Sequence, residues 1–401
     1  MPQTAQTGRI SGQKPFVIMT KPAGPACNYA CDYCYYTDKK DLFDKGNAFR
    51  MAPELLETFI HDYIAASPGP VVQFAWQGGE PTLLGLEYYK MAFQLQQKHC
   101  PTGWTISNAL QTHGGNLDAD WARFLKANDV LVGLSIDGPK ALHDTGRKDR
   151  KGRSTFQKTR AAIKLLQAHG VAFNTLTVVH AQNKDQGAVI YRFLRRIGIR
   201  HMQFIPLVER HTKSGEDAGP PPAPYEKMSP WSLPRDGYGQ FLCDVFDQWI
   251  KDDMKKISVQ SFDILLHAYL GLPSPLCVFA PSCGQALVLE HDGSLYACDH
   301  FVYPEYKRGN IKQTPIAELA GLEVQNQFGK AKSDVSDACK TCPEYRMCYG
   351  GCPKHRFSED QATGTPQNYL CPSYKKLNAH TRKELTQLAY EFRSEQSGLH
   401  P

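Results

Sequence analysis

Three cysteines sit in the segment PACNYACDYCYY, residues 25–36, which follows the apolar stretch FVIMTK (16–21). The apolar stretch predicts a β-strand, so Cys27, Cys31 and Cys34 lie in the loop after it, in a C-x3-C-x2-C spacing. A tetrahedral metal site needs four ligands, and no fourth Cys or His lies nearby, so a structural zinc site fits this run poorly. An iron–sulfur cluster with three cysteine-bound irons and one open iron fits it better.

Alternating strand and helix patterns continue outward from this first strand. Further strands are predicted for VVQFAW (71–76), WTISNAL (104–110), VLVGLSI (130–136), AFNTLTVV (172–179) and MQFIPLV (202–208), and helices for 53–66, 86–99, 118–128, 155–169 and 186–197. Six such units favour parallel strands joined by right-handed crossovers. Because a closed barrel needs eight, we expect an α/β fold with an open, partial (β/α)6 barrel, whose active face lies at the C-terminal ends of the strands.

Length and composition set the domain organisation. The 401 residues, 41% of them hydrophobic, predict one large and one smaller domain. We expect a flexible N-terminus at 1–15, the barrel at 16–270 with a Pro-rich surface loop at 209–237, a cysteine-rich domain at 271–374, and a C-terminal helix and tail at 375–401. In the cysteine-rich part, the segment 286–300 predicts a short hairpin that turns at Asp292 and Gly293.

Charge and hydropathy exclude two classes of partner. The formal net charge of +6 is small, and the basic stretch 146–160 has no interleaved aromatic residues, so we expect no nucleic-acid partner. No apolar run approaches the length of a membrane span, which predicts no membrane association. The first fifteen residues carry no hydrophobic signal core, so we expect a cytoplasmic protein.

The remaining cysteines gather late in the chain. Since cytosolic thiols stay reduced, metal or cluster ligation explains the thirteen cysteines better than disulfides do. Eight of them, enough for two sites with four thiolates each, are Cys277, Cys283, Cys298, Cys339, Cys342, Cys348, Cys352 and Cys371. Two zinc sites stay open as the alternative to two clusters. Cys100 and Cys243 lie on helical patterns and are interpreted as small buried hydrophobes.

The first cysteine run, with Tyr33 just before its last cysteine, resembles the signature of the radical S-adenosylmethionine (SAM) enzymes. The resemblance implies that the open iron binds SAM, and that Gly78, Gly79 and Glu80 of QGGEP (77–81) lie at its methionine amino group. It also implies contacts of Ser135, Arg147 and Val208 with the ribose, the methionine carboxylate and the adenine, respectively. The plain alternatives are a helix cap, a surface cation and a core residue.

The run CKTCPEYRMCYGGC (339–352), followed by Cys371, resembles the SPASM domain, which carries two auxiliary [4Fe–4S] clusters, making three in all. By that resemblance the ligands interleave, and this pairing does not follow from the sequence alone. The first set is Cys277, Cys283, Cys298 and Cys352, and the second is Cys339, Cys342, Cys348 and Cys371.

Within that group the chain resembles the anaerobic sulfatase-maturating enzymes, from about residue 17 to 374. The matching segments include FAWQGGEPTLLGLEYY, LVGLSIDGPKALHD, MQFIPLVER, CGQALVLEHDGSLYACDHF and RGNI. This implies oxidation of a Cys or Ser side chain, in a Cys/Ser-x-Pro-x-Arg motif of an unfolded sulfatase, to Cα-formylglycine. One departure is His113 in QTHG (111–114), where the family usually has Asn.

That reaction requires a hydrogen-atom acceptor, a base and an electron acceptor. In the resemblance the 5′-deoxyadenosyl radical takes the hydrogen atom from Cβ, Asp299 accepts the proton, and the adjacent auxiliary cluster takes the electron. The alternative for Asp299 is a carboxylate that only accepts backbone hydrogen bonds. A one-electron reductant such as flavodoxin or ferredoxin is implied as a partner. Another SPASM-type peptide modifier, forming thioether or carbon crosslinks, and a metal-stapled scaffold without activity remain as alternative functions.

Overall fold

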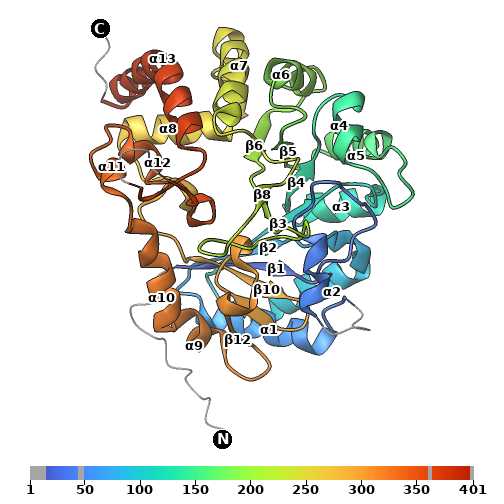
Figure 1. Cartoon of the computed structure of the whole chain (residues 1–401). Helices are drawn as coiled ribbons and strands as arrows, with labels where there is room; N and C mark the ends of the chain where they lie inside the picture. Colours follow the sequence, from blue (N-terminus) through green and yellow to red (C-terminus); the bar gives the residue numbers. More distant parts are fainter. Residues whose placement is uncertain (1–14, 44–48, 360–363, 398–401) are drawn as a thin grey trace, which may run out of the picture.

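A single curved sheet organises the computed structural model, which describes residues 15–43, 49–359 and 364–397 (Figure 1). Its strands run in the order β12-β11-β10-β1-β2-β3-β4-β5-β6-β9. Their bounds are β1 Val17–Lys21, β2 Val71–Trp76, β3 Thr105–Thr112, β4 Leu131–Ser135, β5 Phe173–Val179, β6 His201–Pro206, β9 Ser258–Val259, β10 Ala286–Glu290, β11 Ser294–Tyr296 and β12 Lys307–Asn310. Two small separate sheets pair β7 Arg210–His211 with β8 Lys227–Met228 and β13 Ser358–Glu359 with β14 Pro366–Gln367.

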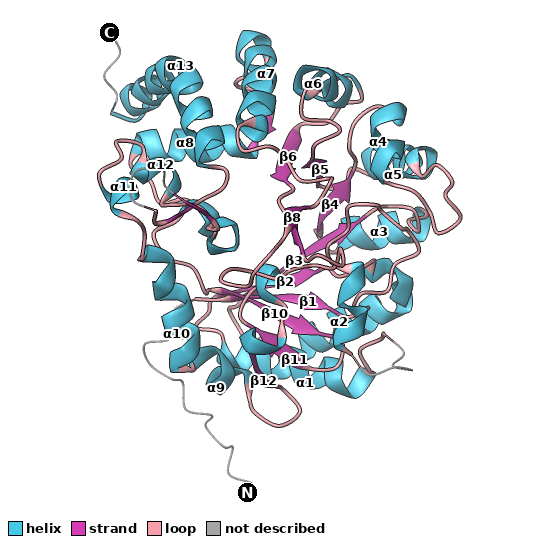
Figure 2. Cartoon of the chain, viewed as in Figure 1, coloured by secondary structure: helices cyan, strands magenta, loops and turns pink. Residues whose placement is uncertain are grey.

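Helices lie around the outside of this sheet (Figure 2). The barrel helices are α1 Pro53–Ala66, α2 Leu86–His99, α3 Ala119–Ala127, α4 Lys140–Gly146, α5 Phe156–Ala168, α6 Gly187–Arg196, α7 Gly237–Asp252 and α8 Gln260–Leu270. The later helices are α9 Ile316–Gly321, α10 Glu323–Lys330, α11 Asp337–Lys340, α12 Tyr345–Cys348 and α13 Cys371–Ser397. Local signals explain several ends: Pro53 occupies the first turn of α1, and Gly271 ends α8 in a left-handed conformation.

The predicted open partial barrel is confirmed. Strands β1 to β6 are parallel neighbours in chain order, and the six strand and five helix predictions agree with the observed elements to within about two residues. A strand–helix–strand crossover places each strand's C-terminal end on the same edge of the sheet. The loops after β1, β2, β3 and β4 therefore meet on one face.

The C-terminal hairpin extends the barrel sheet, which the sequence did not predict. Strands β10 and β11 pair antiparallel around the predicted turn, and Gly293 there has a φ of 89°. Strand β10 also pairs in parallel with β1, with Val17 opposite Ala286. The cysteine-rich segment is thereby joined to the strand that precedes the first cysteine run.

Three segments differ from or lie beyond the sequence expectations. Helix α4 was not predicted, because its seven residues carry too few apolar positions to give a periodic signal. The Pro-rich loop at 209–237 is mostly irregular, but β7 and β8 form a two-residue ladder within it. The predicted flexible N-terminus lies outside the described residues except for residue 15, as does the end of the predicted tail at 398–401.

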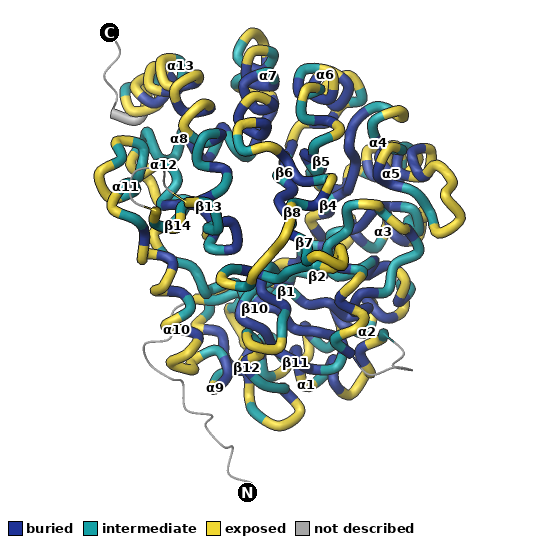
Figure 3. The backbone as a smooth tube through the Cα atoms, viewed as in Figure 1, coloured by how far each residue is buried: buried dark blue, intermediate teal, exposed yellow. Residues whose placement is uncertain are grey.

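Burial concentrates on the strands and on the inner faces of the helices (Figure 3). Aromatic side chains of α1 and β2 are almost fully buried and pack against one another, including Phe59, Tyr63, Phe74 and Trp76. Such close packing holds the strand ends in fixed positions. Each helix in the described ranges is too short or too polar to cross a bilayer.

Candidate active site

The loop after β1 carries the first three cysteines and rests on the loop after β2. The backbone N–H of Gly79 donates to the Gly24 carbonyl at 2.8 Å, and that of Glu80 donates to the Ala26 carbonyl at 2.8 Å. A Cβ atom at Gly79 would lie 2.1 Å from the Ala26 oxygen, so only glycine permits this approach. The position of Cys27 is thus tied to the QGGEP segment.

The three thiols of this loop lie close enough to influence one another. Burial raises the pKa of both Cys27 and Cys31 to about 12, and neighbouring thiolates add to the rise. The backbone N–H of Tyr29 donates to Cys27 Sγ at 3.3 Å, which favours the thiolate. All thirteen cysteines are free thiols. Buried thiols that repel one another as anions suit a cation or cluster that neutralises them.

The side chain of Glu80 forms hydrogen bonds with other residues of the protein. Its carboxylate accepts hydrogen bonds from Thr112 Oγ1 at 2.7 Å, from the Thr82 backbone at 3.1 Å and from the His113 backbone at 2.9 Å. These bonds hold the ends of β2 and β3 together. Gly78 has a φ of 135°. Because glycine has no side chain, only the backbone of this residue faces the cysteine loop.

Tyr33 and Arg147 meet on a carboxylate that the sequence analysis did not single out. Asp137, two residues past β4, accepts from Arg147 Nε at 2.8 Å, from the Tyr33 hydroxyl, and from the Val178 backbone at 3.0 Å. Burial would raise the pKa of Asp137, but the Arg147 guanidinium holds it below its ordinary value. The buried pair links the cysteine loop to the loop after β4 and to β5 itself.

Ser135 and Val208 are both buried at strand ends. Ser135 is the last residue of β4, and Val208 follows β6 by two residues. They lie on the same edge of the sheet as the cysteine loop.

Asp299 lies beside the same loop, although it comes from the C-terminal part of the chain. It opens a short 3-10 helix two residues after Ala297, and its carboxylate forms an ion pair with Lys21, the last residue of β1. The Tyr35 hydroxyl donates to Asp299 Oδ2 at 2.9 Å. Burial alone would raise the pKa of Asp299, but the Lys21 ammonium and the Tyr35 hydroxyl bring it below its ordinary value. The carboxylate is therefore charged.

Lys21 is buried with three polar or aromatic neighbours. Besides Asp299, its Nζ lies 3.4 Å from Gln77 Oε1 and 3.9 Å from the centre of the Tyr36 ring. Tyr36 in turn donates to Glu290 at 2.7 Å. The sequence analysis missed Lys21 because a single lysine that ends an apolar strand gives no distinctive pattern.

One set of four C-terminal cysteines includes Cys283 and Cys298, which lie just before and just after the β10–β11 hairpin. Burial, together with the Cys352 and Cys277 thiols, raises the pKa of Cys298 well above its ordinary value. Burial and the Cys277 thiol raise the pKa of Cys352 to about 12 and that of Cys283 to about 11. His300 Nδ1 lies 3.3 Å from Cys352 Sγ. These four thiols are therefore neighbours in the structure.

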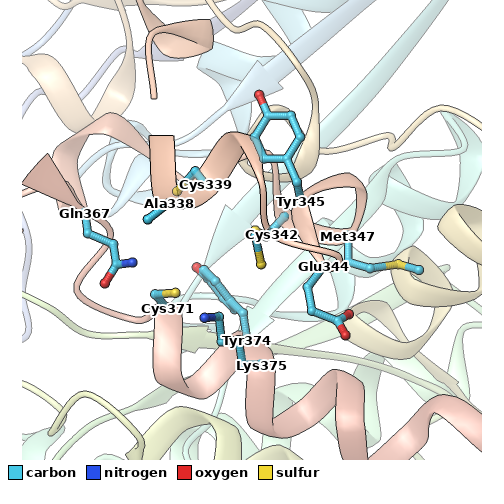
Figure 4. Close-up of a pocket in the computed structure, with 11 residues that line it drawn as sticks. Ala338, Cys339, Cys342, Glu344, Tyr345, Met347, Gln367, Cys371, Tyr374 and Lys375 are labelled. Atoms are coloured by element: carbon cyan, nitrogen blue, oxygen red, sulfur yellow. The ribbon is translucent and has the colours of Figure 1, made fainter. Parts of the chain in front are cut away.

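The second set lines a pocket between α11, α12 and the start of α13 (Figure 4). Cys339, Cys342, Cys348 and Cys371 all face this pocket, with Tyr345 and Tyr374 beside them. Burial raises the pKa of Cys348 to about 11, and the thiols of Cys371 and Cys339 add to the rise. The structure thus separates the eight cysteines into two groups of four.

Within the described ranges, no group of three Cys, His, Asp or Glu side chains is spaced to hold a single metal ion. A [4Fe–4S] cluster binds its four thiolates through four different irons, so it requires a wider spacing than one ion does. Grouped, buried, unoxidised thiols are the donor set that such clusters use.

Comparison with known proteins defines the class. Residues 22–194 match the Radical SAM superfamily, and residues 277–343 match SPASM, an iron–sulfur cluster-binding domain. The chain is therefore a radical SAM enzyme with a SPASM domain, and enzymes of this kind use SAM and iron–sulfur clusters.

Whole-chain relatives define the family. The serine-type anaerobic sulfatase-maturating enzyme of Bacteroides thetaiotaomicron is 39% identical over 389 residues, covering 96% of this chain and 94% of the relative. The cysteine-type enzyme of Clostridium perfringens is 34% identical, covering 94% of this chain and 98% of the relative. The structure of anSMEcpe with bound AdoMet and Cp18Cys peptide superimposes with a TM-score of 0.83 at 33% identity, covering 94% of this chain and all of that one. The chain belongs to the anaerobic sulfatase-maturating enzymes.

Proposed function

We propose that this enzyme oxidises the Cys or Ser of a Cys/Ser-x-Pro-x-Arg motif, in an unfolded sulfatase polypeptide, to Cα-formylglycine. One observation carries the proposal: Asp299 directly follows Cys298, pairs with Lys21 just before the first cysteine run, and accepts from Tyr35 just after it. A proton acceptor therefore lies between two groups of thiols. Oxidation of a side chain at Cβ removes a hydrogen atom, a proton and an electron, so it needs a proton acceptor and an electron acceptor close to the group that takes the hydrogen atom.

Each cysteine group receives a role in this proposal. Cys27, Cys31 and Cys34 would hold a [4Fe–4S] cluster with one iron open to SAM, and the two groups of four would hold auxiliary [4Fe–4S] clusters. SAM bound at the first cluster supplies, on reduction, the radical that removes a hydrogen atom from the substrate. Gly78, Gly79 and the Glu80 backbone would lie at its methionine amino group, with Tyr33, Ser135, Arg147 and Val208 around the rest of it.

Asp299 would accept the proton from the substrate thiol or hydroxyl. A Ser side chain would then give the aldehyde directly, whereas a Cys side chain would give a thioaldehyde that water hydrolyses to the aldehyde with release of hydrogen sulfide. The Asp299 carboxylate is buried and held in place by Lys21 and Tyr35, so little reorganisation is needed when the proton arrives. The group of Cys277, Cys283, Cys298 and Cys352 adjoins Asp299 and would hold the electron acceptor. The cluster in the pocket lined by Cys339, Cys342, Cys348 and Cys371 would pass the electron outward.

The remaining partner is a one-electron reductant such as flavodoxin or ferredoxin, because SAM cleavage consumes an electron. We place the reaction in the cytoplasm, where reducing conditions keep the cysteines available for cluster binding.

The activity is tested with anaerobically reconstituted enzyme, SAM, dithionite and a peptide that contains Cys-x-Pro-x-Arg or Ser-x-Pro-x-Arg. Mass spectrometry is expected to show the aldehyde product and an equivalent of 5′-deoxyadenosine. A crosslinked peptide in place of the aldehyde would contradict the proposal. Reconstituted protein is expected to bind about twelve irons, and a value near four would exclude the auxiliary clusters.

The role of Asp299 is tested with Asp299→Asn, which keeps the size of the side chain. We expect this variant to cleave SAM in the presence of the peptide but to form formylglycine at least 100-fold more slowly, in line with the loss of a general base. Formation of formylglycine at the wild-type rate would show that another group accepts the proton.

A further inference from the structure

His113 packs against the first cysteine loop through the Tyr29 ring. It follows the last residue of β3 and is 6% exposed. Its imidazole ring stacks on the Tyr29 ring, with the centroids 3.6 Å apart and the planes 10° from parallel. Tyr29 is two residues past Cys27, so this contact joins the third strand to the cysteine loop.

The hydrogen bonds of His113 fix its tautomer. The backbone N–H of Gly115 donates to Nδ1 at 2.9 Å, so Nδ1 carries no proton. The proton therefore lies on Nε2, which donates to Asn28 Oδ1 at 2.7 Å and lies 3.2 Å from Glu80 Oε2. Burial lowers the pKa of His113 below its ordinary value, consistent with this neutral form.

Through Asn28 and Glu80, the hydrogen bonds of His113 extend to the loop after β1 and to the loop after β2. Asn28 Nδ2 donates to Asn116 Oδ1 at 3.1 Å, and Asn116 Nδ2 donates to Thr82 Oγ1 at 2.9 Å. Thr82 Oγ1 is itself bonded to Glu80. His113 thus contacts both residues that follow Cys27, one through a hydrogen bond and the other through stacking.

The contact with Tyr29 bears directly on the Cys27 sulfur. The Tyr29 backbone N–H points at Cys27 Sγ, 3.3 Å away, and the orientation of that peptide depends on where the Tyr29 side chain is held. Hydrogen bonds to the sulfurs of a cluster raise its reduction potential because they stabilise the added negative charge. A residue that fixes the Tyr29 peptide therefore influences how readily the neighbouring cluster is reduced.

We propose that His113 is a positioning residue that, by stacking on Tyr29 and bonding Asn28, fixes the N–H···S hydrogen bond to Cys27 and the orientation of the first cysteine loop. The inference rests on the proposed ligation of a cluster by Cys27. It assigns to the His side chain a function beyond filling space at the end of β3.

Three variants separate the two contacts. His113→Ala removes both, His113→Phe keeps the stacking and loses the hydrogen bond, and Tyr29→Leu removes the stacking while keeping every backbone N–H. His169→Ala is the control, because His169 is the C-cap of α5, and its Nδ1 lies 3.0 Å from the Leu165 carbonyl of that helix. Iron content and thermal unfolding are measured first for each protein.

The decisive measurement is a redox titration followed by electron paramagnetic resonance, restricted to the part of the signal that changes when SAM is added. We expect a more negative midpoint potential for His113→Ala and Tyr29→Leu, and a smaller shift for His113→Phe. The KM for SAM should rise roughly tenfold in His113→Ala, because the loop that carries Cys27 is then held less often in the arrangement that binds SAM. His169→Ala should have the same midpoint potential and the same KM for SAM as the wild type.

The outcomes are distinguishable. If His113→Ala keeps its iron, its midpoint potential and its KM for SAM, the inference is wrong while the proposed function stands. If the wild-type protein shows no signal that responds to SAM, the proposed function fails instead. If His113→Ala does not fold, Tyr29→Leu carries the test: an unchanged potential in that variant would overturn the inference.

Discussion

The contact between Gly79 and the Ala26 carbonyl gives the sharpest test of how the first cysteine loop is held. Gly79→Ala adds one methyl group, and the backbone at Gly79 is outside the left-handed region, so alanine meets no conformational barrier. The new Cβ would, however, lie 2.1 Å from the Ala26 oxygen and 2.8 Å from the Pro25 carbonyl carbon. Backbone atoms cannot rotate away, so the two loops must separate.

The size of the effect follows from that overlap. Cβ atoms essentially never approach another atom closer than 3.0 Å, so the loop carrying Cys27 must move by about 1 Å. A misplacement of about 1 Å costs on the order of 100-fold in rate when reacting groups must be aligned. The hydrogen bonds from Gly79 to Gly24 and from Glu80 to Ala26 would lengthen together, because both cross the same interface.

The assay is the rate of 5′-deoxyadenosine formation under dithionite, with saturating peptide, in protein of known iron content. We expect kcat/KM for SAM to fall about 100-fold in Gly79→Ala. Gly321→Ala is the matched control: a Cβ there meets no atom within 4 Å, and alanine should leave activity unchanged. Wild-type kcat/KM in Gly79→Ala would refute the view that this close approach positions the cysteine loop.

Three further predictions concern stability, each read from thermal unfolding of the reconstituted protein. Arg147→Gln leaves Asp137 buried without its cation and should cost about 3–5 kcal/mol, most of it recovered in the double variant with Asp137→Asn. Gly239→Ala places a Cβ 2.5 Å from the Ser373 oxygen, so α7 and α13 must shift, and a loss of about 1–3 kcal/mol is expected despite the higher helix propensity of alanine. Burial holds the pKa of His143 near 4, below its ordinary 6.5. Between about pH 6.5 and pH 4, His143 is protonated in the unfolded chain but neutral in the folded protein. The free energy of unfolding should therefore fall as the pH drops through this range, and it should fall less in His143→Gln.

The sequence predicted the barrel well because its signals are local. Each strand and helix has its own periodicity, caps and turn residues, and the prediction needed only the rule that successive βα units pack in parallel. The pairing of β10 with β1 was out of reach, since it joins segments far apart in the chain and no pattern within either one specifies the partner. Helix α4 was missed for the opposite reason, being too short to show a period.

For the candidate site, the sequence indicated the kind of site but not which residues contact one another. The thiol spacing indicated the kind of site, and in the structure the eight C-terminal cysteines lie in two groups of four. The partners of the charged residues were not predictable: Arg147 and Tyr33 share Asp137, and Asp299 pairs with Lys21. Such pairs depend on loops from different strands converging in space. Cys243 is buried as expected, whereas Cys100 is only half-buried because it follows the last residue of α2.

The parallel pairing of β1 with β10 also has a consequence for how the protein is made. Val17 emerges early from the ribosome, yet its neighbour Ala286 is synthesised only roughly 15–50 s later at typical rates of translation. During that interval one edge of β1 lacks its final hydrogen-bonding partner, and the adjoining thiols have neither Asp299 nor the late cysteines beside them. Cluster loading in the cell is therefore expected to follow chain completion, and a ribosome stalled before residue 286 should yield a nascent chain that takes up little iron.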